Sequence, residues 1–186
     1  MSIPEQLKLN YEDYLNLPND GKCHEIIDGE HYLTPAPQTR HQIVSRNIGR
    51  ILLNYIEEND LGQLLNAPID VILSDTTVVQ PDLLFLRKER ENIIKKNYIK
   101  GPPDLIIEIL SPGNEKLDRL TKMKYYATYG VAEYWLIDFE ARILEQNVLK
   151  GGIFERTSVF SHNFSSSLFP DLTINLTQIF KGPGFL

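Results

Sequence analysis

Two helices are predicted by the spacing of apolar residues along the chain. Apolar residues recur every three or four positions from about Thr39 to Asn59, as on one face of a helix. A short helix is predicted at Tyr11–Leu17, because Pro18–Gly21 then ends it. The stripe of the long helix consists of Ile43, Val44, Ile48, Ile51, Leu52, Tyr55 and Ile56.

Short apolar and β-branched runs predict strands between and after these helices. Glu25–Leu33 is typical of a β-hairpin, because Asp28 and Gly29 form a strong two-residue turn signal between apolar flanks. Four more runs follow the long helix, divided by prolines or by polar pairs. These runs are Leu64-Leu65, Ile69–Leu73, Thr77–Val79 and Leu83–Leu86, and we expect them to form a meander.

The second half of the chain predicts a buried strand, another helix and further strands. Pro102–Pro112 is apolar on both alternating faces apart from its acids, which is typical of a strand covered on both sides. A helix is expected from Asn114 to Tyr129, where Gly130 stops it. Strands are predicted at Glu133–Asp138, Arg142–Leu149 and Phe154–Phe160, and a docking strand or turn with a final short helix at Leu168–Phe180. The fold class is therefore α/β or α+β, with a mixed sheet flanked by helices and an N-terminal hairpin.

Length and composition indicate one cytoplasmic domain. A chain of 186 residues favours a single domain, 1–186. No stretch approaches the roughly 20 apolar residues that span a bilayer, and the N-terminus lacks an apolar signal core. Cys23 is the only cysteine, which excludes an internal disulfide and fits a reducing compartment.

The net charge of −6 argues against binding nucleic acid, because phosphate backbones are bound by positive surface. The segment from Arg87 to Lys100 is an exception, with six basic and two acidic residues. Two interpretations stay open for this segment: a solvated surface loop or a phosphate contact.

Glu108 is the most informative residue for function. It lies in the middle of the apolar run from Leu105 to Leu110, where a side chain facing either way meets protein. A buried carboxylate costs several kcal/mol unless a cation, a set of donors or a metal accompanies it. A plain ion pair with Lys or Arg is as good an explanation as a functional site.

Asp82 and Lys122 add to this picture. Asp82 opens a neighbouring strand after Pro81, and two carboxylates on adjacent strands call for a divalent ion or a shared proton. Oxygen ligands suit Mg²⁺ or Mn²⁺, although a turn-capping aspartate after proline is common. Lys122 shares a helix face with Asp118 and Tyr126 and can reach the acids, but spacing alone favours a surface Asp118–Lys122 pair.

Several motifs together resemble the Uma-two family of proposed restriction endonucleases, within the PD-(D/E)XK nuclease superfamily. The resemblance covers about residues 11–180. It rests on HEIIDGE at His24–Glu30, His41 at the start of the long helix, QPDLLF at Gln80–Phe85, PDLIIEILSPG at Pro103–Gly113 and DRLTKMKYYATYGVAEYWLID at Asp118–Asp138.

The resemblance implies a restriction-endonuclease-like core with a metal site. Asp82 and Glu108 would be the two motif acids, and the backbone carbonyl of Ile109 a further metal ligand. The lysine expected two residues after Glu108 is replaced by Leu110, so Lys122 is the candidate for a migrated lysine. Glu25 would be an auxiliary acid beside the metal, with a partner for Lys or Arg as the alternative.

His41 and the aromatic residues are weaker candidates. A histidine at a helix N-terminus tends to be neutral and can orient a water or contact phosphate, although a structural hydrogen-bonded histidine is more common. Tyr125, Tyr126, Tyr129, Tyr134 and Trp135 have the spacing of core and interface residues rather than of a base-stacking surface.

These expectations define a leading function and two rivals. The leading function is Mg²⁺- or Mn²⁺-dependent hydrolysis of DNA phosphodiester bonds by Asp82, Glu108 and Lys122. The rivals are an inactive nuclease-like binding or scaffold protein, and a hydrolase or small-ligand module acting on another phosphate substrate. By analogy, a homodimer is expected, with the Tyr134-Trp135 region or the C-terminal strands as its interface.

Overall fold

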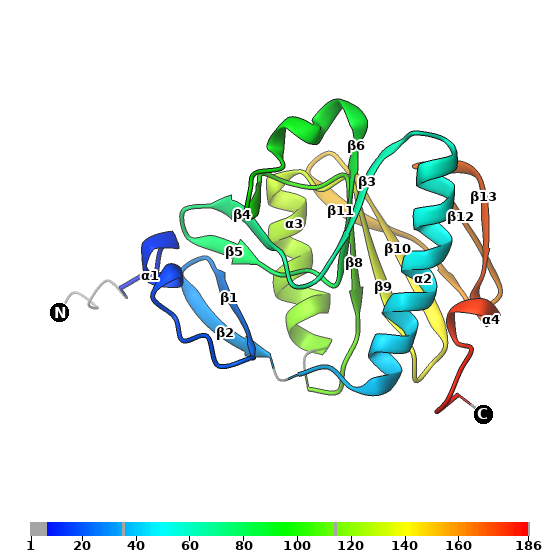
Figure 1. The fold of residues 1–186 in the computed structure, drawn as a ribbon, viewed down its shortest axis with the longest axis horizontal. Helices are drawn as coiled ribbons and strands as arrows, with labels where there is room; N and C mark the ends of the chain where they lie inside the picture. The colour runs from blue at the N-terminus through cyan, green and yellow to red at the C-terminus, as the bar shows by residue number, and fades with distance from the viewer. Residues whose placement is uncertain (1–6, 35, 114, 186) are drawn as a thin grey trace.

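The centre of the protein is a six-stranded mixed sheet. The computed structural model describes residues 7–34, 36–113 and 115–185. The strand order is β11-β10-β9-β8-β6-β3, with β8 and β9 parallel and the other neighbours antiparallel (Figure 1). The strands are β3 (Gly62–Asn66), β6 (Leu83–Arg87), β8 (Leu105–Ile109), β9 (Glu133–Asp138), β10 (Ile143–Lys150) and β11 (Ile153–Phe160).

Different elements cover the two faces of this sheet. On one face, α2 (Thr39–Glu58) packs together with the C-terminal segment, and on the other lies α3 (Met123–Tyr129). Side chains of β8 alternate between the faces: Ile107 and Ile109 pack with α2, and Ile106 packs on the α3 side. By this alternation Glu108 lies on the α3 face. The C-terminal elements are β12 (Asn163–Ser166), β13 (Phe169–Asn175) and α4 (Leu176–Ile179).

A second, five-stranded sheet carries the N-terminal hairpin, in the order β2-β1-β5-β4-β7. The hairpin turn is the predicted one, with φ of 52° at Asp28 and 80° at Gly29. Two consecutive positive φ values match the right-handed twist of paired strands, which explains the Asp-Gly sequence. The strands are β1 (Cys23–Ile27), β2 (Glu30–Thr34), β4 (Asp70–Ser74), β5 (Thr77–Val79) and β7 (Tyr98–Lys100).

The predicted meander is wrong, although its strands exist. Of the four strands of the predicted meander, only β4 and β5 pair as sequence neighbours, while β3 pairs with β6 in the central sheet. β5 joins the hairpin through a pair between Ile26 and Val78. Hydrophobic runs indicate which segments are strands, but they do not indicate which strands pair with each other.

The helix after β8 differs from a regular α-helix. Its expected start, Asn114, lies outside the described residues. Leu117–Lys122 forms a π-helical segment, η2, which continues into α3 and ends at Gly130 with φ of 88°. π-helical turns are rare and occur often at functional sites. The other helices agree with the prediction, since α1 covers Tyr11–Leu15 and α2 covers Thr39–Glu58.

Burial corrects one further expectation. Tyr134 and Trp135 are fully buried in the core, so they cannot form a dimer interface. Tyr126 is buried as well, in agreement with the expected core packing. Among the described residues, no helix is both long and apolar enough to cross a membrane.

Candidate metal centre

The two motif acids lie opposite each other at one end of the central sheet. In the antiparallel pair of β6 and β8, Leu83 faces Ile107 and Leu84 faces Ile106. Continued one step beyond β6, this register would bring Asp82, which lies in a bend, opposite Glu108, and both side chains line one cavity. Side chains opposite each other in such a pair lie on one face, with Cβ atoms about 5 Å apart, and like charges there repel. The register therefore places two carboxylates where a cation is needed between or beside them.

Asp82 is held by two hydrogen bonds that reach the same oxygen. The backbone N–H of Ile109 donates to Oδ2 over 2.8 Å, and His41 Nε2 lies 3.1 Å from that oxygen. His41 is buried at the start of α2, and its Nδ1 has no hydrogen-bond partner within the described part of the chain. The Asp82 side chain is 20% exposed. Its Oδ2 is thus fixed by protein, and the side chain still reaches open space.

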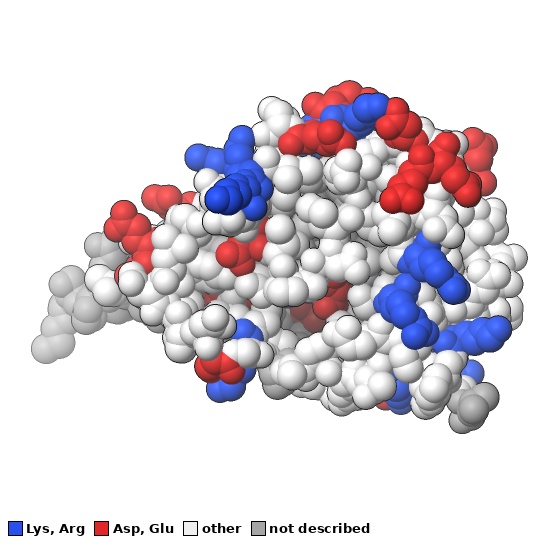
Figure 2. All heavy atoms as spheres, viewed as in Figure 1, with Lys and Arg blue, Asp and Glu red and all other residues white. Residues whose placement is uncertain are grey.

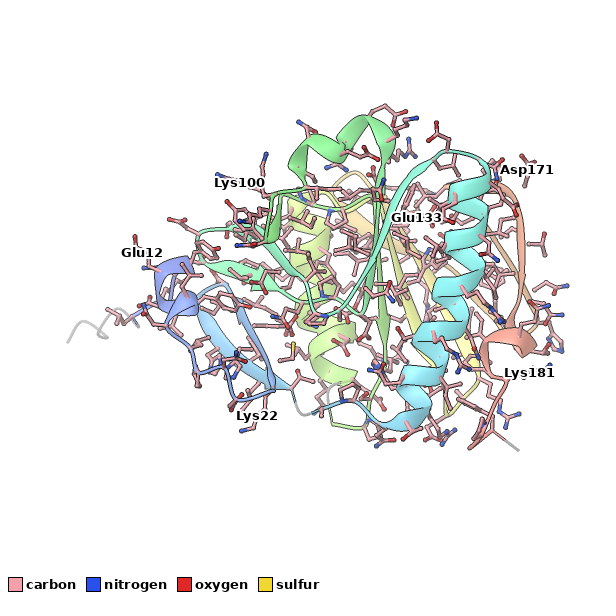
Figure 3. The ribbon with its side chains drawn as sticks, viewed as in Figure 1. Glu12, Lys22, Lys100, Glu133, Asp171 and Lys181 are labelled. Atoms are coloured by element: carbon pink, nitrogen blue, oxygen red, sulfur yellow. The ribbon has the colours of Figure 1, made fainter. Side chains whose placement is uncertain are left out.

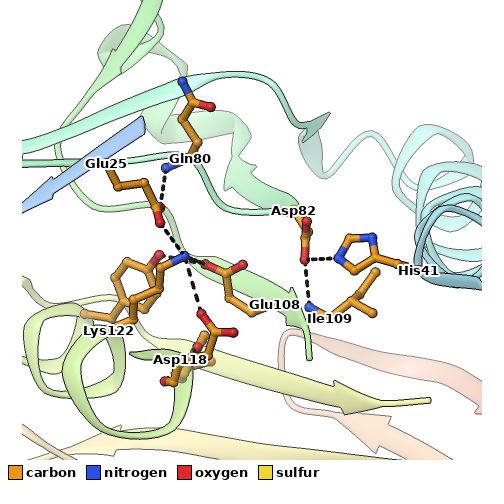
Figure 4. A network of polar contacts seen from close by, with 10 residues as sticks. Glu25, His41, Gln80, Asp82, Glu108, Ile109, Asp118 and Lys122 are labelled. Carbon is orange, nitrogen blue, oxygen red and sulfur yellow. Dashed lines mark hydrogen bonds and ion pairs between the residues drawn. The ribbon is translucent and has the colours of Figure 1, made fainter. Parts of the chain in front are cut away.

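Glu108 is bound from the α3 face. Lys122 Nζ lies 3.0 Å from its Oε1, and the Tyr126 hydroxyl donates to the same oxygen over 2.9 Å (Figure 4). All three residues are almost completely buried. This contact confirms that a buried Glu108 has a cationic partner, and it shows that the partner is Lys122.

Lys122 touches two further carboxylates. Its Nζ lies 3.0 Å from Glu25 Oε2 and 3.5 Å from Asp118 Oδ1. Glu25 Oε1 accepts the backbone N–H of Gln80 over 2.8 Å, whereas Oε2 receives no aligned hydrogen bond from the described residues. The contact between Lys122 and Glu25 is therefore ionic rather than a well-directed hydrogen bond. Asp118 and Lys122 do form the pair that the spacing indicates, but its expected place at the surface is wrong, because both side chains are buried.

The surroundings shift the pKa values of these groups. Burial raises the pKa of the Glu108 carboxyl well above its usual range, although Lys122 opposes this shift. Burial lowers the pKa of the Lys122 ammonium, but Glu108 and Glu25 outweigh it and raise that pKa well above the usual range. Burial also raises the pKa of Asp118 to about 6. Lys122 therefore keeps its positive charge, whereas the carboxyl groups of Glu108 and Asp118 beside it are costly to ionise.

One cavity of about 460 Å³ is lined by four acids of this cluster, Glu25, Asp82, Glu108 and Asp118. Figure 2 shows acidic side chains recessed in a hollow near the middle of the face shown. Lys122 is the cation that contacts three of them. When all four acids are ionised, one lysine leaves a surplus of three negative charges. Buried charges of one sign are costly, so this surplus favours the binding of a further cation.

The donor set fits a hard divalent ion. Asp82 and Glu108 present carboxylate oxygens to the same cavity, and Mg²⁺ is commonly held by one or two carboxylates while it keeps several waters. Among the described residues, no three His, Cys, Asp or Glu side chains converge as a complete metal cage. A zinc-type site with four protein ligands is therefore not what these residues form, whereas a two-carboxylate site for Mg²⁺ or Mn²⁺ fits them.

The structure also places the remaining candidates. Leu110 is buried in the core on the α3 side, so position 110 serves packing rather than chemistry. The basic segment begins at the far end of β6 from Asp82, about 16 Å away for five strand residues. Within it, η1 spans Lys88–Ile93, and Arg90 pairs with Asp104 at 3.0 Å. The distance from Asp82 and the ion pair of Arg90 favour the interpretation of this segment as a surface loop rather than as a phosphate contact.

Two site residues escaped the sequence analysis. Asp118 was expected at the surface, and Tyr126 was expected only to pack in the core. Their spacing of four residues from Lys122 does indicate that all three share one helix face. The hydrogen bond from the Gln80 backbone to Glu25 has no signal in the sequence, because any residue provides a backbone N–H.

The fold and the family match define a restriction-endonuclease-like class of protein. Residues 11–177 match the model of the Uma2 family, described as "Putative restriction endonuclease", so the chain belongs to this family. The crystal structure of "a putative nuclease belonging to DUF820" from Anabaena variabilis superposes with a TM-score of 0.77. It has 19% identity and covers 92% of this chain and 97% of that one, which shows the shared fold. An uncharacterised Synechocystis protein, slr1290, is 25% identical over 132 residues, covering 70% of this chain and 68% of its own length.

The raised pKa of Asp118 predicts a pH-dependent stability that the Asp118→Asn variant lacks. A carboxyl whose pKa is higher in the folded than in the unfolded state binds more protons when folded. The stability that protonated Asp118 contributes is therefore fully present below its unfolded-state pKa of 3.8, and it is lost as the pH rises through the folded-state pKa of about 6. Urea unfolding at pH 4, 5, 6 and 7 should show wild type losing stability relative to the variant across this window. If wild type and Asp118→Asn differed in their free energy of unfolding by the same amount at every pH, the raised pKa of Asp118 would be contradicted.

Proposed function

We propose that the protein is a metal-dependent endonuclease that hydrolyses DNA phosphodiester bonds at the cavity formed by Asp82, Glu108 and Lys122. The observation that carries this proposal is the cluster of four acids that line one cavity with a single buried lysine, which leaves a surplus of negative charge when the acids are ionised. Such a surplus is costly in a purely structural cluster and useful in one that binds a divalent ion. Membership of a family described as restriction endonucleases supports the same choice of reaction.

Asp82 and Glu108 would hold Mg²⁺ or Mn²⁺, together with the backbone carbonyl of Ile109. Bound there, the ion would supply Lewis acidity towards the scissile phosphate and the attacking water. The N–H of Ile109 and the ring of His41 keep Asp82 Oδ2 in place, and Tyr126 does the same for Glu108 Oε1. His41 therefore acts here by positioning Asp82, and Glu25 is a further acid of the same cavity, in contact with Lys122.

Lys122 would stabilise the charge that develops on the phosphate as water adds and the P–O bond to the leaving group breaks. A positioned, buried ammonium is effective at this, because the low local dielectric around it strengthens its interaction with an anion. Lys122 already lies at the border of the cavity that Asp82 and Glu108 share. This placement supports its role as the lysine that position 110 lacks.

The proposed substrate is DNA, and the proposed active form is a homodimer. Figure 2 shows basic side chains over α2 beside the hollow, and Arg46 and Arg50 are exposed on that helix. Positive charge in this place would contact the phosphate backbone while the acids hold the metal. Two copies of one small domain would supply the two sites needed to cut both strands of a duplex.

The ion pair between Lys122 and Glu108 also favours a second candidate function, an inactive nuclease-like scaffold. In such a protein the lysine would neutralise Glu108 permanently, and the net charge of −6 would go with a partner other than DNA. The two candidates differ in metal binding. The scaffold predicts no calorimetric signal for Mg²⁺ or Mn²⁺ that depends on Glu108.

Replacing either metal-binding acid should abolish cleavage. Asp82→Asn and Glu108→Gln keep the side-chain shape and remove one negative charge each. We expect Mg²⁺-dependent cleavage of plasmid DNA to fall by about a thousandfold or more, since several kcal/mol of transition-state stabilisation are lost. Asp171→Asn, an exposed acid on β13, should cleave like wild type. Wild-type rates in both site variants, with folding verified by circular dichroism, would rule out the assignment.

Lys122→Met should separate chemistry from metal binding. Loss of the ammonium is expected to lower the single-turnover rate of cleavage by about a hundredfold. Mn²⁺ affinity should not fall, because the cation that occupies Glu108 has been removed. Lys124→Met provides the matched control, since Lys124 is an exposed lysine on the same helix. Unchanged cleavage by Lys122→Met would exclude this lysine from the reaction.

A further inference from the structure

The three acids around Lys122 divide into two groups according to what else they reach. Glu108 lies opposite Asp82 in the strand register and shares its cavity. Glu25 and Asp118 come from the hairpin and from η2, and each lies within 3.5 Å of the ammonium. In Figure 4 the carboxylate of Glu108 lies between Lys122 and Asp82, whereas Glu25 and Asp118 flank the ammonium from two other sides.

We propose that Glu25 and Asp118 form a cradle for the Lys122 ammonium, which lets Glu108 turn from the lysine to the metal without leaving either charge unpaired. Glu25 is then a positioning residue that acts through Lys122, and not a metal ligand. This inference rests on the proposed function, because it concerns the same metal site.

Lys122 contacts more carboxylates than charge neutrality requires. A buried ammonium needs one carboxylate for neutrality, and Lys122 has three at 3.0, 3.0 and 3.5 Å. If Glu108 were its only partner, metal binding at Glu108 would leave a buried, uncompensated lysine, which costs several kcal/mol. With Glu25 and Asp118 in place, the lysine keeps two carboxylate partners after Glu108 has turned away.

Glu25 and Asp118 are each held by contacts that do not involve Glu108. Glu25 Oε1 is fixed by the Gln80 backbone N–H, and its Oε2 contacts Lys122. Both oxygens of Glu25 therefore have protein partners on the lysine side of the site. Asp118 is held by the η2 segment, whose backbone is fixed where the Tyr134 hydroxyl donates to the Asp118 carbonyl over 3.1 Å. The cradle is thus anchored independently of Glu108.

The segment formed by η2 and α3 presents one buried face to the site. Asp118, Lys122 and Tyr126 are all buried, and Lys122 and Tyr126 both contact Glu108 Oε1. Arg119, between them in sequence, instead pairs with Glu145 on β10. This second ion pair fixes the segment to the sheet and keeps Asp118 against Lys122.

A double-mutant cycle on Mn²⁺ affinity tests the cradle. Calorimetry with Mn²⁺ alone would compare wild type, Glu25→Gln, Lys122→Met and the double variant, each verified as folded by circular dichroism. Glu25→Gln removes one partner of the lysine, so Lys122 should bind Glu108 more firmly and Mn²⁺ affinity should fall by about fivefold. In the Lys122→Met background this fall should shrink to about twofold or less, the effect of one distant charge.

The cradle is supported when the fall caused by Glu25→Gln is at least twofold larger with Lys122 than without it. A smaller difference overturns it, since a metal ligand loses affinity in either background. If Lys122→Met does not fold, the Mn²⁺ affinity of Asp118→Asn decides. A lowered affinity supports the cradle. An unchanged affinity in Asp118→Asn, together with a lowered affinity in Glu25→Gln, overturns it. Absence of Mn²⁺ binding by wild type would instead refute the proposed function itself.

Discussion

The site depends on one constraint, the burial of the Glu108 carboxylate in the centre of a sheet that is covered on both faces. Removal of this group from water costs several kcal/mol, and only a close cation and good donors offset that cost. Lys122 and Tyr126 meet this requirement on a single oxygen. The rest of the cluster follows from the need to keep Lys122 itself neutralised when Glu108 has another partner.

The fold brings these groups together from distant parts of the chain. Antiparallel register between β6 and β8 sets Asp82 opposite Glu108, and α2 adds His41 from the other side of the sheet end. The parallel pair of β8 and β9 requires a crossover, and η2 with α3 is that crossover. Because the crossover helix packs on the α3 face, Lys122 reaches the face on which Glu108 lies. Figure 3 shows Glu133 deep among the strands and Lys100 towards the outside.

Sequence reasoning reached much of this arrangement but not its connections. The hydrophobic periods identified α2 and the helical segment before Gly130, and the Asp28-Gly29 turn signal identified the hairpin. A lone acid within an apolar run identified Glu108 as a buried residue. The meander was wrong, because pairing of β3 with β6 depends on contacts across an insertion of two strands. The buried role of Asp118 was missed because an i, i+4 acid–lysine pair looks the same in sequence on an exposed helix and on a buried one. The contact from the Gln80 amide to Glu25 depends on tertiary structure alone.

The central claim is that Asp82 and Glu108 hold a divalent ion while Lys122 stays beside it. A crystal soaked in Mn²⁺ and measured at the manganese absorption edge tests this most directly. The account predicts one anomalous peak in contact with Asp82 and Glu108, with Lys122 still paired to Glu25 and Asp118. No anomalous density at these two acids, with Lys122 still bound to Glu108 at high Mn²⁺ concentration, would contradict it.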